Sequence, residues 1–217
     1  MGLNLEVAGL VKSYNGQAVL RDCSFDFAPG RTYALQGLNG SGKSTFLRIA
    51  ALLEAPDAGE VRYGDQGAGL PHDLSLRRRI TLLLPRIGVF NTSVFHNVAY
   101  GLKIRGQRAQ AVEDLVNEVL GRVGLAHKSR QNGLDLSSGE TKRLGIARAL
   151  VIEPEVFFLD EPTANLDPEN SEIIEQIILG MKTAGKSTII VVTHDPAQAR
   201  RLGDIPLVMA HGKIVPL

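Results

Sequence analysis

The nine residues GLNGSGKST, at positions 37–45, combine three glycines with a lysine and several hydroxyl-bearing side chains. Glycines lack the Cβ atoms that would keep a large anion away from the main chain, and they permit positive φ angles. The exposed N–H groups of such a turn, together with the positive end of a following helix, form a binding site for phosphate. The pattern Gly37-x-x-x-x-Gly42-Lys43-Ser44 is typical of a phosphate-binding loop.

Two side chains of this loop add chemistry to the backbone cradle. Lys43 supplies a positive charge to the β- and γ-phosphates of a nucleotide. The hydroxyl of Ser44 is a ligand suited to Mg²⁺. The alternative is a chance glycine-rich turn, but the loop follows a strand pattern and opens a helix pattern, as the motif requires. The loop therefore predicts nucleotide binding but does not indicate the class of nucleotide-binding protein.

A second cluster of reactive groups stands in VFFLDEPT, residues 156–163, where apolar residues end in two carboxylates. A buried strand would carry Asp160 at its C-terminal end, beside the phosphate loop, where it can hold Mg²⁺ directly or through water. Glu161 is suited to polarise an attacking water. The alternative is a solvent-exposed strand end, which the preceding apolar run makes the poorer interpretation.

A third motif lies in LDLSSGETKRLGIARAL, residues 134–150. Ser137 and Glu140 have the spacing of a capping box, so we expect a helix to begin at Ser137 with free N–H groups in its first turn. Ser138 and Gly139 keep that turn slim. This would be a second anion site, although a lone capping box is usually structural.

The segments around these motifs follow helix and strand periodicities. Strands are predicted at residues 31–37, 59–65, 77–84, 156–160 and 187–193, helices at 43–53, 94–104, 109–123 and 168–182, and a strand, turn and strand at the end. Buried strands alternating with helices indicate an α/β fold with a mostly parallel sheet. Residues 3–35 alternate more and predict an antiparallel β segment on that core, within one domain of residues 1–217.

Composition narrows the class of protein. The 217 residues carry 24 Lys and Arg against 23 Asp and Glu, so no overall charge attracts nucleic acid or anionic lipid. Cys23 has no partner cysteine, which fits a reducing compartment and a core position. The N-terminus predicts no signal peptide, and no apolar run approaches the length of a membrane span. We therefore expect a cytoplasmic protein that needs another chain for any membrane-spanning part.

Taken together, the motifs resemble those of the ATP-binding cassette, the ATPase subunit of ABC transporters, over nearly the whole chain. GLNGSGKST resembles the Walker A loop, LSSGE the signature LSGGQ, and VFFLDEP the Walker B strand with its catalytic glutamate. ANLD, which ends at Asp167, resembles the D-loop, and VVTHD carries a match to the switch histidine, His194. Tyr14 matches the aromatic residue that stacks on adenine, although alone it would be a packing residue.

The resemblance implies a P-loop NTPase core, an N-terminal antiparallel β subdomain and an inserted helical subdomain at about residues 86–150. It implies that two copies pair head to tail, with ATP between the Walker A loop of one and the signature of the other. Glu161 and His194 would be catalytic, and Ser44 and Asp160 would bind Mg²⁺. The nucleotide-binding set would be Tyr14, Gly37, Asn39, Gly40, Ser41, Gly42, Lys43, Ser44, Thr45, Ser137, Ser138, Gly139, Glu140 and Asp167.

Three positions depart from the family pattern. Ser138 stands where glycine is usual and Glu140 where glutamine is usual, but small size and capping capacity survive both changes. Pro85, in ITLLLPRIGVF, occupies the position of the glutamine that reaches Mg²⁺, and the nearest glutamines are Gln66 and Gln107. Proline has no side-chain oxygen and fixes φ, so we expect slower hydrolysis or looser coupling than with glutamine.

The segment FNTSVFHNVAYGLKIRG, residues 90–106, resembles the part of importer subunits that receives the membrane partner, and especially that of tungstate and related oxyanion importers. It would also be the first helix of the subdomain, capped by Asn91 or Ser93. The expected function is an ATPase that powers import of a small oxyanion through a separate integral membrane permease. A solute-binding protein would be an indirect partner, and the chain would lie on the inner face of the membrane.

Other classes remain open. A lipoprotein- or division-type ABC ATPase binds a membrane partner without moving a solute, and a regulatory cassette with weak hydrolysis would suit Pro85. DNA-repair members carry long coiled coils, whereas this chain has no heptad run, and translation factors carry two cassettes in one chain. Aromatic residues make up 5% with no tryptophan, so no nucleic acid is expected as partner. The cargo and the permease are determined by chains other than this one.

Overall fold

The computed structural model describes residues 2–217, which divide into two compact units. The first unit takes in the described part of residues 1–82 together with Glu155–Glu161 and Gly180–Leu217. The second unit comprises Leu83–Pro154 and Pro162–Leu179.

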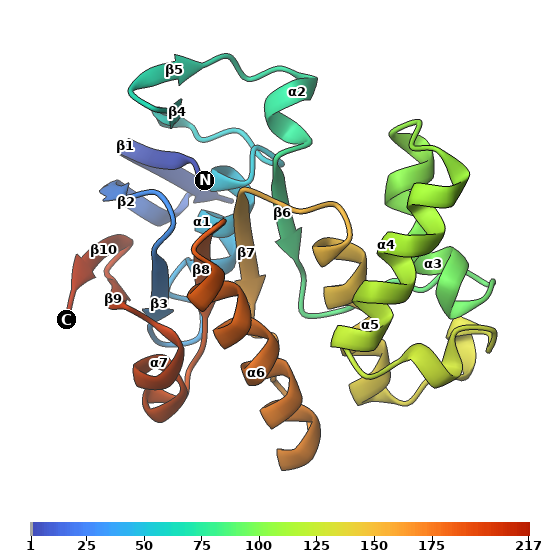
Figure 1. Cartoon of the computed structure of the whole chain (residues 1–217). Coiled ribbons are helices and arrows are strands. Elements are labelled where there is room, and N and C mark those ends of the chain that lie inside the picture. Colours follow the sequence, from blue (N-terminus) through green and yellow to red (C-terminus); the bar gives the residue numbers. More distant parts are fainter. Residues whose placement is uncertain (1) are drawn as a thin grey trace. The chain divides into compact units, whose positions relative to one another are not determined.

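A six-stranded sheet forms the centre of the first unit, in the order β10-β9-β3-β8-β7-β6 (Figure 1). The pairs β9–β3, β3–β8 and β8–β7 are parallel, whereas β10 is antiparallel to β9. Every residue of β7 and β8 is buried, which explains why these strands are apolar runs and not alternating ones. The bounds are β3 (Thr32–Gln36), β6 (Ile80–Leu83), β7 (Val156–Asp160), β8 (Thr188–Val192), β9 (Ile205–Ala210) and β10 (Lys213–Pro216).

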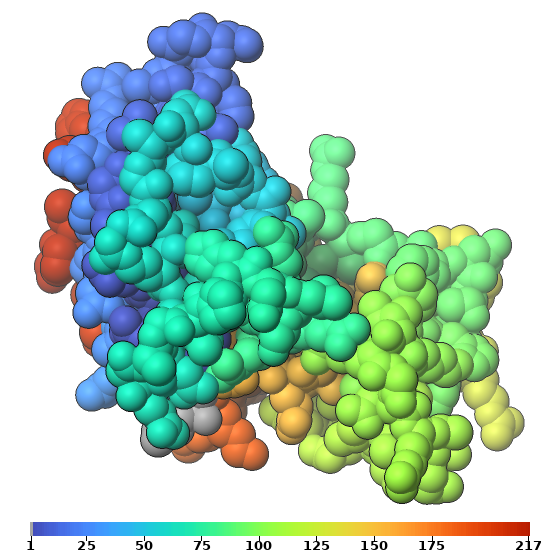
Figure 2. All heavy atoms as spheres, turned by 90° about the horizontal axis from the view of Figure 1, so that it is seen from above, coloured from blue at the N-terminus to red at the C-terminus, as the bar shows by residue number. Residues whose placement is uncertain are grey.

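A second sheet, wholly antiparallel, has the order β2-β1-β4-β5, with β1 (Asn4–Tyr14), β2 (Gln17–Phe27), β4 (Ala58–Asp65) and β5 (Ala68–Leu70). In Figure 2 the blue N-terminal residues lie between the cyan and teal residues and the red C-terminal residues. The Arg21 N–H donates to the Gly212 carbonyl over 3.0 Å, and Thr188 Oγ1 donates to the Leu3 carbonyl over 2.7 Å. These bonds join the two sheets.

An aromatic cluster fills the core of this unit. The rings of Phe27 and Tyr33 meet edge to face with centroids 4.9 Å apart, and Phe27 stacks on Phe46 at 5.9 Å. Cys23 is fully buried in the same core on β2, as predicted for a structural cysteine. Burial raises the pKa of its thiol to about 11.

Helices dominate the second unit, which contains α3 (Val94–Ile104), α4 (Ala109–Arg122), α5 (Ser138–Leu150), two 3-10 turns (Ala126–Lys128 and Gly133–Asp135) and most of α6 (Pro168–Ala184). The predicted apolar stripe of α4 packs inward, with Val112, Val116, Val119 and Leu120 buried. Ser93, one of the two predicted caps, begins α3, because its Oγ accepts from the His96 N–H. Asn91 instead accepts from Asn132 Nδ2 over 2.8 Å.

Most predicted elements are confirmed, and two of their boundaries are wrong by three residues. The helix α1 (Lys43–Ala50) is three residues shorter than its predicted range, because Leu52 adopts a φ of 58° and ends it. The predicted strand at 77–84 begins only at Ile80, since the arginines before it close a short helix, α2 (Leu74–Arg77), capped by Asp73. The last helix, α7 (Pro196–Leu202), was not predicted. Among the described residues no helix combines the length and apolarity that crossing a membrane requires.

Candidate functional site

The phosphate loop connects β3 to α1 in the first unit. Gly37 leaves the strand with a φ of 147°, and a Cβ atom there would lie 2.6 Å from the Met209 carbonyl oxygen, so only glycine fits. Gly42 precedes the first residue of α1 with a φ of 105° and no side-chain cap. The first-turn N–H groups of α1 are therefore left for an anion, as the motif predicts.

The loop wraps around the side chain of Lys43, which is only 6% exposed. Its ammonium donates to the carbonyls of Gly37 and Leu38 over 2.8 and 2.9 Å. An ammonium has three N–H donors, so this geometry keeps the charge inside the loop without exhausting its hydrogen-bonding capacity. Ser41 Oγ is buried and has no partner within residues 2–217, which makes it a donor in need of an acceptor such as a phosphate oxygen.

The two predicted metal ligands meet at the start of α1. The hydroxyl of Ser44 is hydrogen-bonded to the carboxylate of Asp160, the last residue of β7. Asp160 is 3% exposed, and burial raises the pKa of its carboxyl against the opposing effects of Ser44, Lys43 and Arg48. A hydroxyl and a buried carboxylate at one point are oxygen donors of the kind that Mg²⁺ binds beside nucleotide phosphates.

Glu161 follows β7 in a strained backbone conformation, with a φ of 48°. Its N–H donates to the Val192 carbonyl over 3.2 Å, which ties the strained residue to the end of β8. A left-handed conformation costs a non-glycine residue about 1 kcal/mol, and such strain collects at functional sites. The His194 Nδ1 atom lies 3.9 Å from Oε1 of Glu161.

A cavity of about 850 Å³ in the first unit is lined by six of the predicted residues, whereas Lys43, Ser44 and Asp160 are not part of its lining. Its lining contains five loop residues, 37–41, both predicted catalytic side chains, and segments of β9 and the C-terminus. The members from the prediction are Gly37, Asn39, Gly40, Ser41, Glu161 and His194. The cavity therefore has loop residues, a carboxylate and an imidazole in one lining.

The signature motif lies in the second unit and forms the predicted capping box. Ser137 Oγ accepts from the Glu140 N–H over 3.3 Å, and Glu140 Oε2 accepts from the Ser137 N–H over 3.0 Å. Lys128 forms an ion pair with Glu140 at 2.5 Å and is the largest cause of the lowered pKa of that carboxyl. Ser137 and Ser138 are exposed at the start of α5, so the first turn is accessible to a ligand.

Gly139 packs against Asn170, a residue that was not predicted from the sequence. A Cβ atom at Gly139 would lie 2.3 Å from the side chain of Asn170, so any larger residue would have to displace that side chain. Asn170 in turn donates from its N–H to Asp167 Oδ1 over 2.8 Å and from Nδ2 to Asp167 Oδ2 over 2.7 Å. The signature and the predicted D-loop are thereby in contact within one unit, and only the capping-type spacing from Asp167 to Asn170 could have signalled it.

The predicted adenine-stacking residue, Tyr14, ends β1 with 39% of its surface exposed. Its hydroxyl is hydrogen-bonded to Glu54, and Arg48 Nη2 donates to the same hydroxyl over 3.3 Å. Thr45, another predicted nucleotide-binding residue, accepts from Arg48 over 3.3 Å. Neither Glu54 nor Arg48 was predicted from the sequence to belong to the site.

Comparison with known proteins explains this set of loops. Residues 20–164, more than half of the chain, match the family model described as ABC transporter. The chain belongs to the ABC transporter family. It is therefore an ATP-binding ATPase subunit, as the motifs predicted.

Relatives of this ABC protein are similar along nearly its whole length. The tungstate uptake system ATP-binding protein TupC of Peptoclostridium acidaminophilum is 36% identical, with 98% of this chain and 97% of the relative covered. The phosphate import ATP-binding protein PstB 2 of Natronomonas pharaonis is 35% identical, with 97% and 78% covered.

Solved structures share the fold of this ABC subunit. The structure of cbiO1 from Clostridium perfringens, part of the ABC transporter complex cbiONQ, superposes with a TM-score of 0.86 at 28% identity, covering 99% of this chain and 88% of the other. The dimeric structure of MJ0796, a bacterial ABC transporter cassette, gives 0.85 at 25% identity, with 97% and 96% covered.

Proposed function

We propose that the chain hydrolyses MgATP in the cavity beside the phosphate loop and that this powers the import of a small oxyanion, such as tungstate, through a separate membrane permease. The observation that carries the catalytic part is the meeting of Glu161 and His194, 3.9 Å apart, in the lining that also contains the phosphate loop. Glu161 orients or activates the attacking water, and His194 donates to the γ-phosphate. The nucleotide is bound by the loop donors and Lys43.

Mg²⁺ fits the residues present. Ser44 and Asp160 would hold it through a hydroxyl and a carboxylate oxygen, and the described residues contain no larger cluster of acidic or histidine ligands that would favour an all-protein metal cage. When bound, the ion neutralises charge on the β- and γ-phosphates. The raised pKa of Asp160 follows mainly from burial, and a neighbouring cation would oppose that effect.

Two copies of the chain would complete each nucleotide site. The capping box leaves Ser137 and Ser138 exposed at the N-terminus of α5, which is thirteen residues long and carries a positive end. A second copy could place the γ-phosphate of its bound ATP there, and the existence of a dimeric relative supports this arrangement. We therefore propose an ATP-dependent head-to-tail dimer.

The importer assignment draws on the relatives, whose names include tungstate uptake and phosphate import. Within the second unit, the segment predicted to receive the permease exposes aromatic rings. Phe90 and Tyr100, with centroids 4.8 Å apart, are 40% and 48% exposed, and the Arg148 guanidinium covers Phe90 at 4.7 Å. Asn97, fully buried, fixes the loop by donating to the carbonyls of Phe90, Thr92 and Ser93. A helix of a permease is a suitable partner for such a rigid, partly apolar surface.

A detergent pull-down from native membranes with the tagged full chain tests this assignment. We expect a multi-spanning permease and a solute-binding protein to co-purify, and the cytoplasmic face of the membrane to be the site of action. The purified complex should hydrolyse ATP faster when the loaded solute-binding protein is added. Recovery of ribosomal or chromosomal proteins alone would contradict the import function.

A regulatory cassette with weak hydrolysis is the second candidate, because of Pro85. This residue is exposed two positions beyond β6 and offers no oxygen to a metal ion. MgATP turnover by the purified chain that disappears in the Glu161→Gln variant would exclude this candidate. No turnover in the wild type, with tight MgATP binding retained, would support it.

A further inference from the structure

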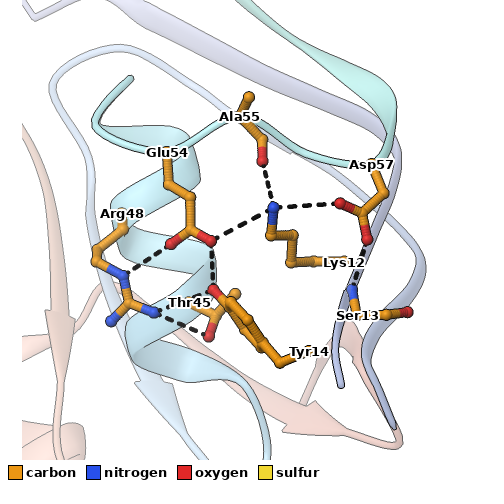
Figure 3. Close-up of polar contacts among 8 residues, drawn as sticks. All are labelled: Lys12, Ser13, Tyr14, Thr45, Arg48, Glu54, Ala55 and Asp57. Atoms are coloured by element: carbon orange, nitrogen blue, oxygen red, sulfur yellow. Dashed lines mark hydrogen bonds and ion pairs between the residues drawn. The ribbon is translucent and has the colours of Figure 1, made fainter. Parts of the chain in front are cut away.

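Tyr14 is connected to the phosphate-loop helix by a continuous chain of polar contacts, drawn in Figure 3. Its hydroxyl donates to Oε1 of Glu54, and the other carboxylate oxygen of Glu54 accepts from Arg48 Nε over 3.0 Å. Arg48 Nη2 then reaches Thr45 Oγ1 at 3.3 Å. Both Arg48 and Thr45 belong to α1, the helix that begins at the phosphate loop.

The end of α1 places Glu54 beside Arg48. Leu52 has a φ of 58°, its N–H donates to the Ile49 carbonyl over 3.0 Å, and the Leu53 N–H donates to the Arg48 carbonyl over 2.9 Å. This pair of bonds is a Schellman motif, which reverses the chain immediately after a helix. Glu54 is the next residue, so its side chain is turned back along the helix toward Arg48 and Tyr14, as Figure 3 shows.

Lys12 occupies one face of the Tyr14 ring. Its ammonium lies 5.6 Å from the ring centroid and is itself fixed by the Ala55 carbonyl at 2.8 Å and by Asp57 at 3.2 Å. Asp57 also accepts from the Ser13 N–H over 2.7 Å. The opposite face of the ring is therefore the one that a base can cover.

The charge of this cluster favours the same geometry. The hydrogen bond from Tyr14 is the largest cause of the lowered pKa of Glu54, with further lowering by Arg48 and Lys12. The carboxylate is thus ionised at neutral pH and accepts a charge-assisted bond from the phenol. A ring held in this way loses less conformational entropy when a base stacks on it than a free side chain would.

We propose that Glu54, supported by Arg48, is a positioning residue that holds the Tyr14 ring at a fixed place relative to the phosphate loop, so that a purine base and its phosphates are bound together. The inference rests on the proposed ATPase function and on the predicted role of Tyr14 as its base-stacking residue. Neither Glu54 nor Arg48 contacts the nucleotide in this scheme. They act through the Tyr14 hydroxyl, whereas the ring itself provides the stacking surface.

Equilibrium binding of MgADP and of inorganic tripolyphosphate tests the proposal with the full chain, because only the first ligand has a base. Tyr14→Phe keeps the ring and removes the donor, and Glu54→Leu removes the acceptor. We expect each to weaken MgADP binding about three- to tenfold, and the double variant no more than either alone, because they break the same bond. Tripolyphosphate binding should not change. Glu60→Gln, which alters an exposed carboxylate paired with Arg62, is the matched control.

Tyr14→Ala separates the two levels of the proposal, since it removes the stacking surface and should weaken MgADP binding roughly ten- to a hundredfold. If Tyr14→Ala binds MgADP as tightly as the wild type, Tyr14 does not stack on the base, and both the base-stacking role and the positioning role are contradicted. If Tyr14→Ala weakens binding but Tyr14→Phe and Glu54→Leu do not, only the positioning role is overturned. An equal loss of MgADP and tripolyphosphate affinity in Tyr14→Phe would also overturn it, because the effect would then be on the phosphate loop.

Discussion

The imidazole of His194 lies 3.9 Å from the carboxylate of Glu161, and the two residues reach this position from the ends of different strands, β8 and β7. Glu161 is 27% exposed and His194 65% exposed, so a water molecule can enter beside the carboxylate. The pair is open on one side and anchored on the other by the bond from the Glu161 N–H to Val192. This geometry suits a reaction in which water attacks a bound phosphate.

Replacing Glu161 by glutamine should lower steady-state MgATP hydrolysis by about 10²- to 10⁴-fold, because the amide cannot act as a general base. MgATP binding should persist, because the phosphate loop is untouched. Size-exclusion chromatography at micromolar protein with MgATP should then reveal the trapped dimer, with MgADP as the control. A variant that binds MgATP tightly yet stays monomeric would contradict the dimer proposal.

The strained backbone of Glu161 predicts a difference between two inactive variants. Glycine adopts the observed φ of 48° without the steric cost that alanine carries. Relief of this strain should raise the free energy of unfolding of Glu161→Gly by about 1 kcal/mol relative to Glu161→Ala. The greater conformational entropy of glycine in the unfolded state should offset part of this increase. Urea unfolding of both variants measures the difference. At a helical or extended position glycine usually makes a protein about 0.5–1 kcal/mol less stable than alanine does. If Glu161→Gly is less stable than Glu161→Ala by this amount, the strain is absent in solution.

Gly139→Ala should destabilise the protein by about 1–3 kcal/mol, because the new Cβ atom overlaps Asn170. Asn170 would have to leave Asp167, which would also disturb the D-loop segment. The same substitution in an Asn170→Ala background, where the space is open, should cost much less. Equal costs in the two backgrounds, measured by denaturant unfolding, would show that the packing contact is not the cause.

Pro85→Gln should raise the rate of MgATP hydrolysis or its response to the permease, because it restores a side-chain oxygen and a flexible backbone at this position. The measurement is ATP turnover of the chain alone and in the co-purified complex, over a range of Mg²⁺ concentrations. Pro85→Ala is the control, since it restores flexibility without the oxygen. Unchanged turnover and an unchanged response to the permease in both variants would mean that Pro85 lowers neither hydrolysis nor coupling.

The capping box of α5 should make stability depend on pH in the acidic range. The pKa of Glu140 is lowered in the folded state, first by Lys128 and then by the Ser137 N–H, so its stabilising effect is complete above the unfolded-state pKa and is lost as pH falls through the folded-state value. Wild type and Glu140→Gln should therefore differ in unfolding free energy at about pH 7 and converge toward about pH 3. A constant difference across this range would show that the charge does not contribute.

The parts of the site that depend on local chemistry could be predicted from the sequence. Gly37 to Ser44 and the box from Ser137 to Glu140 work through turn geometry and short-range hydrogen bonds, which residue type and spacing specify. The position of Asp160 beside the phosphate loop could be predicted, because the C-terminal ends of parallel strands lie on the side of the sheet where the loop also lies.

The features that were missed arise from contacts between distant segments or from unusual backbone. The residues near Gly139 do not indicate that Asn170 will pack on it. A leucine at position 52 does not indicate a left-handed backbone conformation either. Glu54 belongs to no predicted element or motif, and tertiary structure brings it to Tyr14, forty residues away in sequence.

Cys23 is the one thiol of the sequence, it is fully buried on β2, and its pKa of about 11 keeps it protonated at neutral pH. Reagents that need a thiolate therefore have nothing to attack unless the antiparallel sheet opens. The native protein is in effect free of background labelling. Single cysteines introduced at exposed positions can then be labelled selectively with spectroscopic probes. Slow labelling of Cys23 itself would report the rate at which the antiparallel sheet opens.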